Sequence, residues 1–155
     1  MEQEETPLMQ VVMPALLRHA RTTYGAAMRA ALAEGGYDDV PANGMYVIGA
    51  LAISETPLSQ IIRELRMSKQ AAGQLVDALV LRGYLERQVD PADRRRLTIT
   101  LTERGKAAAA TQREAGAAIE AELMARVGQE KILHTREVLA TLIDMHHEAA
   151  EAASD

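Results

Sequence analysis

The sequence predicts a mainly α-helical fold that carries one small β-hairpin. Apolar residues recur at spacings of three and four along most of the chain, which is the period of a helix with one buried face. Residues 84–89 and 96–101 instead alternate at every second position, as strands do. The chain has no Phe, no Trp and four Tyr, so its core must be filled by Leu, Ile, Val, Met and Ala. This composition favours packed helices.

The length and composition exclude several classes of protein. A chain of 155 residues can bury a core without cross-links, so residues 1–155 are expected to form a single domain. The absence of Cys excludes disulfides, thiol catalysis and cysteine–zinc sites. The N-terminus, MEQEETPLMQ, is acidic and lacks the pattern of a secretory signal, and no stretch approaches the ~20 apolar residues of a membrane span. We therefore expect a cytoplasmic protein without a membrane partner.

The charge is distributed unevenly along the chain. Residues 57–106 contain ten Arg or Lys and six Asp or Glu, which gives this segment a net charge of +4. Because the whole chain has a formal charge of −5, the remainder carries −9. A basic middle between acidic ends is an uneven distribution of charge that the function of the middle segment must explain.

The first two helices are predicted from apolar patterning and punctuation. A long apolar stripe runs over residues 9–32, and Gly35-Gly36 ends it. Pro14 cannot lie undisturbed in a helix interior, so this helix either begins there or kinks there. A second, shorter helix is expected from Val40-Pro41 to about residue 52, with the proline in the tolerated first turn. Asn43-Gly44 is typical of a hairpin, but no alternating strands flank it.

Two short helices follow. Thr56-Pro57 is an N-cap followed by proline at the first helical position, and apolar residues then predict a third helix over 58–65. Ser68 caps a fourth helix from residue 69 to about 82, and Gly83 ends it. Its inward-facing residues are expected to be Ala72, Leu75, Val76, Leu79 and Val80.

The predicted hairpin joins residues 84–89 to 96–101 through the turn-forming stretch 90–93. Thr102 caps a fifth, alanine-rich helix that runs to about residue 126. Gly128 separates it from a sixth helix, and the last residues, EAAEAASD, are expected to fray. The apolar stripe of the sixth helix consists of Ile132, Leu133, Leu139, Leu142 and Ile143.

Residues 40–102 therefore have the element order of a winged helix-turn-helix. The second short helix, residues 68–82, has the dimensions to enter a DNA major groove about 12 Å wide. In such a motif glutamine can bond an adenine edge, lysine a guanine edge, and alanine can contact a thymine methyl. On periodicity alone, a solvated surface helix is an equally good explanation. The candidate DNA-reading residues are Ser68, Lys69, Gln70, Ala71, Gly73 and Gln74.

Three consecutive arginines, Arg94 to Arg96, lie at the tip of the hairpin and on its returning strand. An arginine on a slender loop can enter the minor groove, about 6 Å wide, where negative potential is concentrated. Asp93 can orient one guanidinium through a bidentate pair. Taken alone, the cluster is better explained as a solvated charge run paired with nearby carboxylates. The neighbouring reading helix favours the DNA interpretation.

These residues resemble the MarR family of transcriptional regulators. Asp93-x-Arg95-x-x-x-Ile99-x-Leu101-Thr102 matches the wing signature of that family. The stretches Ser68-Lys69-Gln70-Ala71, Leu75-Val76-Asp77 and Arg82-Gly83-Tyr84-Leu85 look like its recognition helix and the exit from it. The resemblance covers the helix order of the whole chain and is specific mainly from about residue 56 to 105.

The resemblance implies a role for each of these parts. A homodimer would be built by residues 8–34 and 103–150, and each chain would carry a winged-helix DNA-binding lobe at residues 40–102. Arg95 would enter the minor groove with Asp93 as its holder, while Arg94 is expected to meet a phosphate or an intramolecular partner. Release from DNA would follow the binding of a small, commonly aromatic or anionic, effector. The major-groove positions carried over are Ser68, Gln70, Ala71 and Gln74.

The sequence departs from the family pattern at two places. Gly73 and Gln74 stand where a hydroxyl residue and a basic residue are frequent. The absence of Cys separates the chain from the peroxide-sensing members.

The need to bury the apolar faces of the long helices also predicts a dimer. The first, fifth and sixth helices cannot bury their stripes against a lobe of about fifty residues, so pairing across a two-fold axis is a natural solution. A monomeric bundle cap is the alternative.

Several tyrosine and histidine residues give weaker functional signals. His19, Tyr24 and Tyr46 are candidate effector-binding residues, although core packing explains such side chains equally well. His19 is expected to be a hydrogen-bonded residue at the core edge rather than a metal ligand. His146-His147 and His134 do not converge on one site, because adjacent helical residues point about 100° apart. No metal and no cofactor are expected.

The sequence thus favours a homodimeric, sequence-specific DNA-binding regulator, most simply a repressor, acting on a pseudopalindromic operator of double-stranded DNA. The main alternative is a winged-helix module that binds another protein without sequence-specific DNA binding. An enzyme is not expected, because no Ser–His–Asp order, glycine-rich phosphate loop or carboxylate pair is present.

Overall fold

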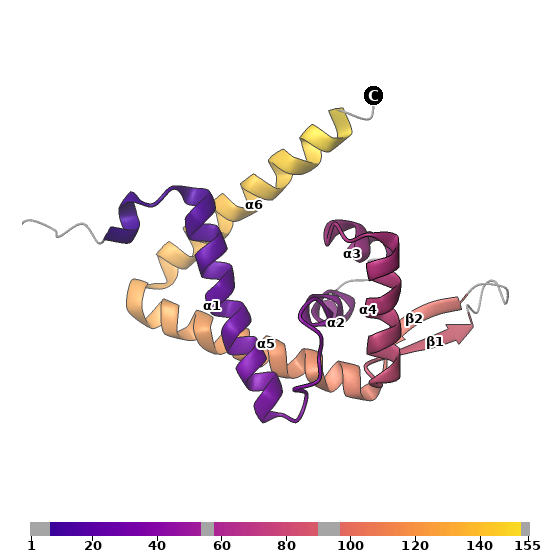
Figure 1. The fold of residues 1–155 in the computed structure, drawn as a ribbon. Helices are drawn as coiled ribbons and strands as arrows, with labels where there is room; N and C mark the ends of the chain where they lie inside the picture. The colour runs from indigo at the N-terminus through magenta and orange to yellow at the C-terminus, as the bar shows by residue number, and fades with distance from the viewer. Residues whose placement is uncertain (1–6, 54–57, 90–96, 153–155) are drawn as a thin grey trace, which may run out of the picture. The chain divides into compact units, whose positions relative to one another are not determined.

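The structure, a computed structural model, describes residues 7–53, 58–89 and 97–152. These residues form a mainly helical chain with a two-stranded antiparallel hairpin, which confirms the predicted fold class. By contacts the chain divides into two compact units, one up to Gly116 and the other from Ala117. A 3₁₀ turn at Pro7–Gln10 comes first. The elements labelled in Figure 1 are α1 Met13–Glu34, α2 Gly44–Ile53, α3 Leu58–Glu64, α4 Lys69–Leu81, β1 Leu85–Val89, β2 Leu97–Leu101, α5 Glu103–Val127 and α6 Gln129–Ala152.

The predicted start of one helix is confirmed and that of another needs correction. The first helix begins at Met13, with Pro14 in its first turn, where the missing N–H costs nothing. Of the two alternatives for Pro14, the structure has the helix start. The second helix was expected to open at Val40-Pro41, but α2 begins at Gly44. The carbonyl of Pro41 instead accepts a bond from the Gly44 N–H at 2.8 Å, which makes this stretch the turn that precedes the helix.

The core of the first unit joins the short helices to the hairpin. Its side chains come from α1, α2, α3, α4, β1 and α5, so the lobe is held together by contacts between residues far apart in the sequence. Large apolar side chains fill it without any Phe or Trp, as the composition predicts. The most deeply buried are Tyr84, Ile48, Ile61, Leu79, Leu85 and Val47.

The hairpin has a regular antiparallel register. Leu85 pairs with Leu101, Arg87 with Ile99, and Val89 with Leu97. Buried Leu85 and half-buried Leu101 lie at the base of the hairpin, so the base packs on the lobe while the strands extend beyond it.

The second unit contains the end of α5 and all of α6. Gly128 separates the two helices with φ +86°, a conformation that glycine adopts without strain. The Arg136 guanidinium donates to both carboxylate oxygens of Glu120, at 2.6 and 2.8 Å, and so ties α6 to α5. The sequence EAAEAASD was expected to fray, but α6 continues to Ala152, in keeping with the high helix propensity of Ala and Glu. Among the described residues, no helix is both long and apolar enough to cross a membrane.

Candidate nucleic-acid interface

The helix α4 begins as the sequence predicts. Ser68 has extended backbone angles, φ −63° and ψ 153°, and its Oγ accepts a hydrogen bond of 3.2 Å from the Ala71 N–H. This bond satisfies one of the backbone donors that the first turn of a helix leaves free. The remaining donors and the positive end of the helix dipole point out of the N-terminus, next to exposed Ser68 and Lys69.

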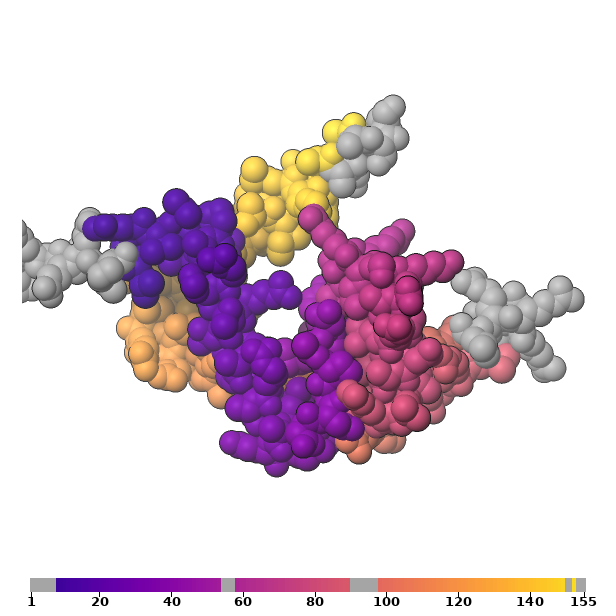
Figure 2. Space-filling view, in the orientation of Figure 1, coloured from indigo at the N-terminus to yellow at the C-terminus, as the bar shows by residue number. Residues whose placement is uncertain are grey.

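One face of α4 anchors the helix and the other is open. Ala72, Leu75 and Leu79 are buried, and at 100° per residue they fall on one side of the helix. The exposed residues fall on the opposite side: Lys69, Gln70, Gly73, Gln74, Asp77 and Leu81. The structure therefore brings Lys69, Gln70, Gly73 and Gln74 together on one exposed face, which lies in the part of the chain coloured magenta to pink in Figure 2. Ala71 is half-buried beside it, while Val76 and Val80, expected inside, are also half-buried.

The turn before α4 contains a backbone feature that the sequence did not reveal. Arg66 has φ 51°, in the left-handed region that residues with a Cβ rarely adopt. This conformation turns the chain sharply between α3 and α4. The Asn43 amide lies 3.8 Å from the Met67 sulfur and closes the same turn from the side of α2.

The base of the hairpin is tied to α4 by an ion pair between Arg87 on β1 and Asp77. Both side chains are substantially exposed, so the pair orients the strand beside the open face of α4 more than it stabilises the fold. Asp93, Arg94 and Arg95, the predicted wing residues, lie outside the described residues, as does Arg96.

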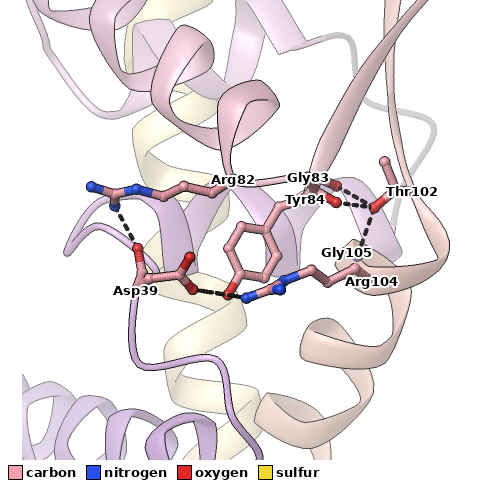
Figure 3. A network of polar contacts seen from close by, with 7 residues as sticks. All are labelled: Asp39, Arg82, Gly83, Tyr84, Thr102, Arg104 and Gly105. Carbon is pink, nitrogen blue, oxygen red and sulfur yellow. Dashed lines mark hydrogen bonds and ion pairs between the residues drawn. The ribbon is translucent and has the colours of Figure 1, made fainter.

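A second polar cluster joins the lobe to α5 (Figure 3). The hydroxyl of Tyr84, a fully buried residue, donates to the Asp39 carboxylate in the loop after α1. Arg104, in the first turn of α5, donates to the Tyr84 hydroxyl and to the same carboxylate, at 3.0 Å each. Its guanidinium also lies 4.7 Å from the centre of the Tyr84 ring. Arg82 donates to the Asp39 carbonyl, so three segments of the chain meet here.

The cluster shifts the ionisation of its members. The hydrogen bond from Tyr84 holds the pKa of Asp39 below its usual value, and the positive charge of Arg104 acts in the same direction against desolvation. Burial raises the pKa of Tyr84, and its hydrogen bond to the Asp39 carboxylate raises it further. At neutral pH the cluster is therefore a carboxylate bound by a neutral phenol and a guanidinium.

Thr102 fixes the junction between β2 and α5. Its hydroxyl donates to the Gly83 and Tyr84 carbonyls, at 2.5 and 3.2 Å, and accepts from the Gly105 N–H at 3.0 Å. The predicted N-cap is thus confirmed, and the same side chain also ties α5 to the segment that leaves α4. The orientation of the hairpin relative to α4 is set by this junction together with the Arg87–Asp77 pair.

The candidate effector residues do not form one cluster. His19 is exposed, which corrects its predicted place at the core edge. Tyr24 is half-buried and lies about 140° around α1 from His19, since each residue turns the helix by 100°. Tyr46, on α2, donates to a Glu64 carboxylate oxygen at 3.0 Å, and burial together with this bond raises its pKa.

Sequence reasoning missed Gln112 on α5. It is 5% exposed, and its Nε2 has no hydrogen-bond partner in the part of the chain that the structure describes. Its Oε1 lies 3.5 Å from the point where a Cβ on Gly49 of α2 would stand, so the amide sits against α2. A lone glutamine in an alanine-rich helix gives no periodic signal, which explains the omission. Among the described residues, no group of three or more His, Cys, Asp or Glu side chains could hold a metal ion.

A comparison of the sequence with known protein families finds a match in this lobe. The model of the MarR family matches residues 38–96, from the loop before α2 to the residue before β2. Over these residues the winged-helix lobe is similar to that family. The family consists of transcriptional regulators, which agrees with the expectation that the chain is not an enzyme. No curated protein matches the chain.

Solved MarR-type structures extend the likeness beyond the lobe. The transcriptional repressor CouR, bound to a 23-mer DNA duplex, is 22% identical, with a TM-score of 0.64 over 92% of this chain and 99% of its own. The Staphylococcus aureus MepR–DNA complex is 17% identical, with a TM-score of 0.66 over 88% and 99%. Escherichia coli MarR without ligand is 18% identical, with a TM-score of 0.63 over 85% and 97%. The TM-scores show a shared fold, and at these identities the likeness shows no more than the fold. The DNA duplexes belong to the CouR and MepR complexes.

Proposed function

We propose that the protein is a sequence-specific DNA-binding transcriptional regulator, with α4 in the major groove and residues 89–97 in the minor groove. The observation that carries the proposal is the two-sided character of α4. Its apolar side is locked into the core by Ala72, Leu75 and Leu79, while its other side is polar, exposed and without a cover from its own chain among the described residues. A rigid helix with an open polar face beside a hairpin is the geometry that base reading requires.

Each exposed side chain of this face has a chemical role in the proposal. Gln70 and Gln74 can each bond an adenine edge through paired donor and acceptor atoms, and Lys69 can donate to guanine. Ser68 and the free backbone donors of the first turn suit a phosphate oxygen. Ala71 contributes a methyl contact from the side of the face. These contacts would read sequence through the glutamines and fix position through the helix end.

The wing supplies the second groove contact. We assign the minor-groove contact to Arg95, with Asp93 orienting it and Arg94 on a phosphate, from the sequence pattern described above. The described strands support this role, since their base is fixed to α4 and α5 through Arg87 and Thr102. A hairpin held at its base can carry a tip side chain into a groove without a large loss of order.

The proposed assembly is a homodimer built by residues 8–34 and 103–150, with the lobe at residues 40–102 reading one half-site. Large apolar side chains on α6 are more than half exposed within one chain, which leaves them for a partner to cover. Two reading helices related by a two-fold axis require a pseudopalindromic operator with half-sites about 34–36 Å apart. The exposed residues of α6 include Leu133, Val138, Ile143 and Met145.

A small-molecule effector is the proposed release signal. The unpartnered Nε2 of Gln112 is a buried donor that a carbonyl or carboxylate oxygen would satisfy. Met28 on α1 approaches α5 near Gly116, one turn from Gln112, and Tyr24 lies one turn before Met28. These residues favour an aromatic acid, with the ring near Tyr24 and the oxygen at Gln112. Tyr46 and His19 remain the weaker candidates, because one is engaged by Glu64 and the other is exposed.

We assign repression rather than activation. A repressor needs only to occupy its operator, whereas an activator also needs a surface for the transcription machinery. The similar fold of CouR, described as a transcriptional repressor, supports the same choice. A regulator of this kind acts in the compartment that holds the DNA, which in a bacterial cell is the cytoplasm.

The test is selection of binding sites from random double-stranded DNA with the purified protein, followed by titration of the selected duplex. We expect a pseudopalindrome and an affinity that falls steeply with salt. Arg95→Ala is expected to weaken binding clearly while the dimer stays intact. Arg96→Ala, which removes the same charge from the adjacent position, is the matched control and is expected to cost much less. Equal effects of the two substitutions would contradict the assignment of Arg95.

The alternative function is binding of another protein through the winged helix. It would be favoured if the protein shifted no DNA at low salt and bound a protein partner with little salt dependence.

A further inference from the structure

Gly73 occupies a position that the folded chain does not require to be glycine. It is the fifth residue of the thirteen-residue helix α4, and it is absent from the positions with positive φ. A Cβ built on it meets no atom within 4 Å. Neither backbone conformation nor packing therefore excludes alanine. Glycine in a helix interior costs about 1 kcal/mol relative to alanine, so within this chain the residue is a net loss of stability.

The surroundings of Gly73 show what the missing side chain leaves open. Gln70 precedes it by one turn, and Gln74 and Asp77 follow on the same exposed side. The outer face of α4 therefore carries no side chain at residue 73, and Gln70 and Gln74 are exposed on the same face. Residue 73 lies in the N-terminal half of α4, and the N-terminal residues of a recognition helix are those that contact base edges.

We infer that Gly73 is a specificity-determining residue that admits the C5 methyl group of a thymine between Gln70 and Gln74. This inference rests on the proposed DNA-binding function. A glutamine that bonds adenine N6 and N7 lies beside the thymine of the same base pair, whose methyl projects into the major groove. A Cα without a side chain is apolar and lets that methyl approach, whereas a Cβ would occupy the same volume. A phosphate oxygen would instead be recognised by a donor, and Gly73 adds none from a side chain.

Two properties of one substitution separate this role from a structural one. Gly73→Ala is expected to raise the melting temperature, because alanine is the better helix former and no atom stands in its way. The same variant is expected to bind the selected operator about tenfold more weakly, since an added methyl overfills a closely packed contact. A gain in stability with a loss in affinity has no explanation within the chain alone.

The deciding experiment uses the purified full chain, wild type and Gly73→Ala, on the selected operator and on duplexes in which each thymine is replaced in turn by deoxyuridine. Deoxyuridine lacks the methyl and keeps every hydrogen-bonding group. We expect one thymine position, the same in both half-sites, at which deoxyuridine restores the variant to within about threefold of wild type on the thymine duplex, a difference below that of a typical base contact.

Three results would overturn the inference. They are an unchanged affinity of Gly73→Ala for the operator, a loss that no deoxyuridine relieves, and a fall in melting temperature. All three leave wild-type operator binding intact, and the proposed function with it. Failure of the wild type to select any sequence would instead remove the proposed function, and this inference with it.

Discussion

Among the glycines of the chain, Gly105 leaves the least room for an added Cβ, which makes Gly105→Ala the most informative stability variant. A Cβ added at Gly105 would stand 2.1 Å from the Tyr84 carbonyl oxygen and 3.0 Å from a Leu101 methyl carbon. Real Cβ atoms essentially never come within 3.0 Å of such atoms, so α5 and the Tyr84 carbonyl would have to separate by at least 0.9 Å. The obstructing atom is backbone, so no side-chain rotation relieves the contact.

The cost follows from what that movement breaks. The Tyr84 carbonyl oxygen accepts hydrogen bonds from the Thr102 N–H at 3.1 Å and from the Thr102 hydroxyl at 3.2 Å. Overfilling a packed site costs about 1–3 kcal/mol, and each weakened hydrogen bond adds about 0.5–1.5 kcal/mol. We therefore expect Gly105→Ala to lower the free energy of unfolding by roughly 2–6 kcal/mol. For a chain of this length that is a fall in melting temperature of about 4–24 °C.

Urea unfolding followed by circular dichroism measures this loss directly, with all variants held at one protein concentration because dimerisation would shift the midpoint. Gly73→Ala is the matched control, since it is the same substitution in a helix of the same unit with open space around it. It is expected to gain stability. A change of less than about 0.5 kcal/mol for Gly105→Ala, the range of a neutral surface substitution, would refute the packing of α5 against Tyr84.

Three further predictions concern polar side chains. The Thr100 hydroxyl is buried and has no partner among the described residues, so Thr100→Val is expected to be neutral or to stabilise the fold by up to about 1 kcal/mol. Thr102→Val removes a hydroxyl that makes three hydrogen bonds and should cost about 1–3 kcal/mol. Thermal unfolding of both variants measures these effects, and the reverse order of stabilities would contradict the prediction. Because Tyr84 and Arg104 lower the pKa of Asp39, the ionised carboxylate stabilises the fold at a pH above the usual pKa of 3.8, and this stabilisation is lost as the pH falls below that value. The difference in unfolding free energy between wild type and Asp39→Asn should therefore shrink in acid. A constant difference from pH 7 to pH 3 would count against the role of Asp39 in the cluster. The Arg87–Asp77 ion pair is exposed, so a double-mutant cycle with alanine at both positions should give a coupling energy below about 1 kcal/mol in unfolding. A larger coupling energy would mean that the pair stabilises the fold rather than orienting the hairpin.

The parts of the fold that sequence predicted well are those set by local chemistry. Ser68 and Thr102 are confirmed as N-caps, because a hydroxyl at that position bonds the backbone N–H three residues on, whatever surrounds it. Strand β1 begins one residue later than predicted, since period-two alternation fixes a strand better than its end, and the predicted start of the second strand at residue 96 lies outside the described residues. The elements that local pattern could identify were therefore found.

The errors come from positions where two local signals compete. At residues 40–44 the proline was read as the first helical residue, but the structure uses it as a turn residue, and both uses suit its fixed φ. At the C-terminus the sequence EAAEAASD is expected to fray, but α6 runs to Ala152, in keeping with the high helix propensity of Ala and Glu.

Other features could not be predicted because they arise from contacts across the chain. Tyr84 lies at the predicted start of a strand, yet it is the centre of a cluster that joins it and the nearby Arg82 to Asp39 and Arg104 from two other segments. The isolation of the Gln112 amide likewise depends on the helices packed around it. For the candidate site, the sequence identified the exposed residues of α4 but not the Arg87–Asp77 pair that orients the hairpin beside them.

The central claim is that the exposed face of α4 reads base sequence. Its most direct test is the affinity of the wild-type protein for the selected operator and for a duplex of the same composition in scrambled order, measured by fluorescence anisotropy between 50 and 200 mM salt, the range over which phosphate-dominated binding changes most usefully. We predict that both affinities fall with salt and that the operator is preferred by a factor of about 10³ or more at every concentration. Equal affinity for the two duplexes would contradict the claim.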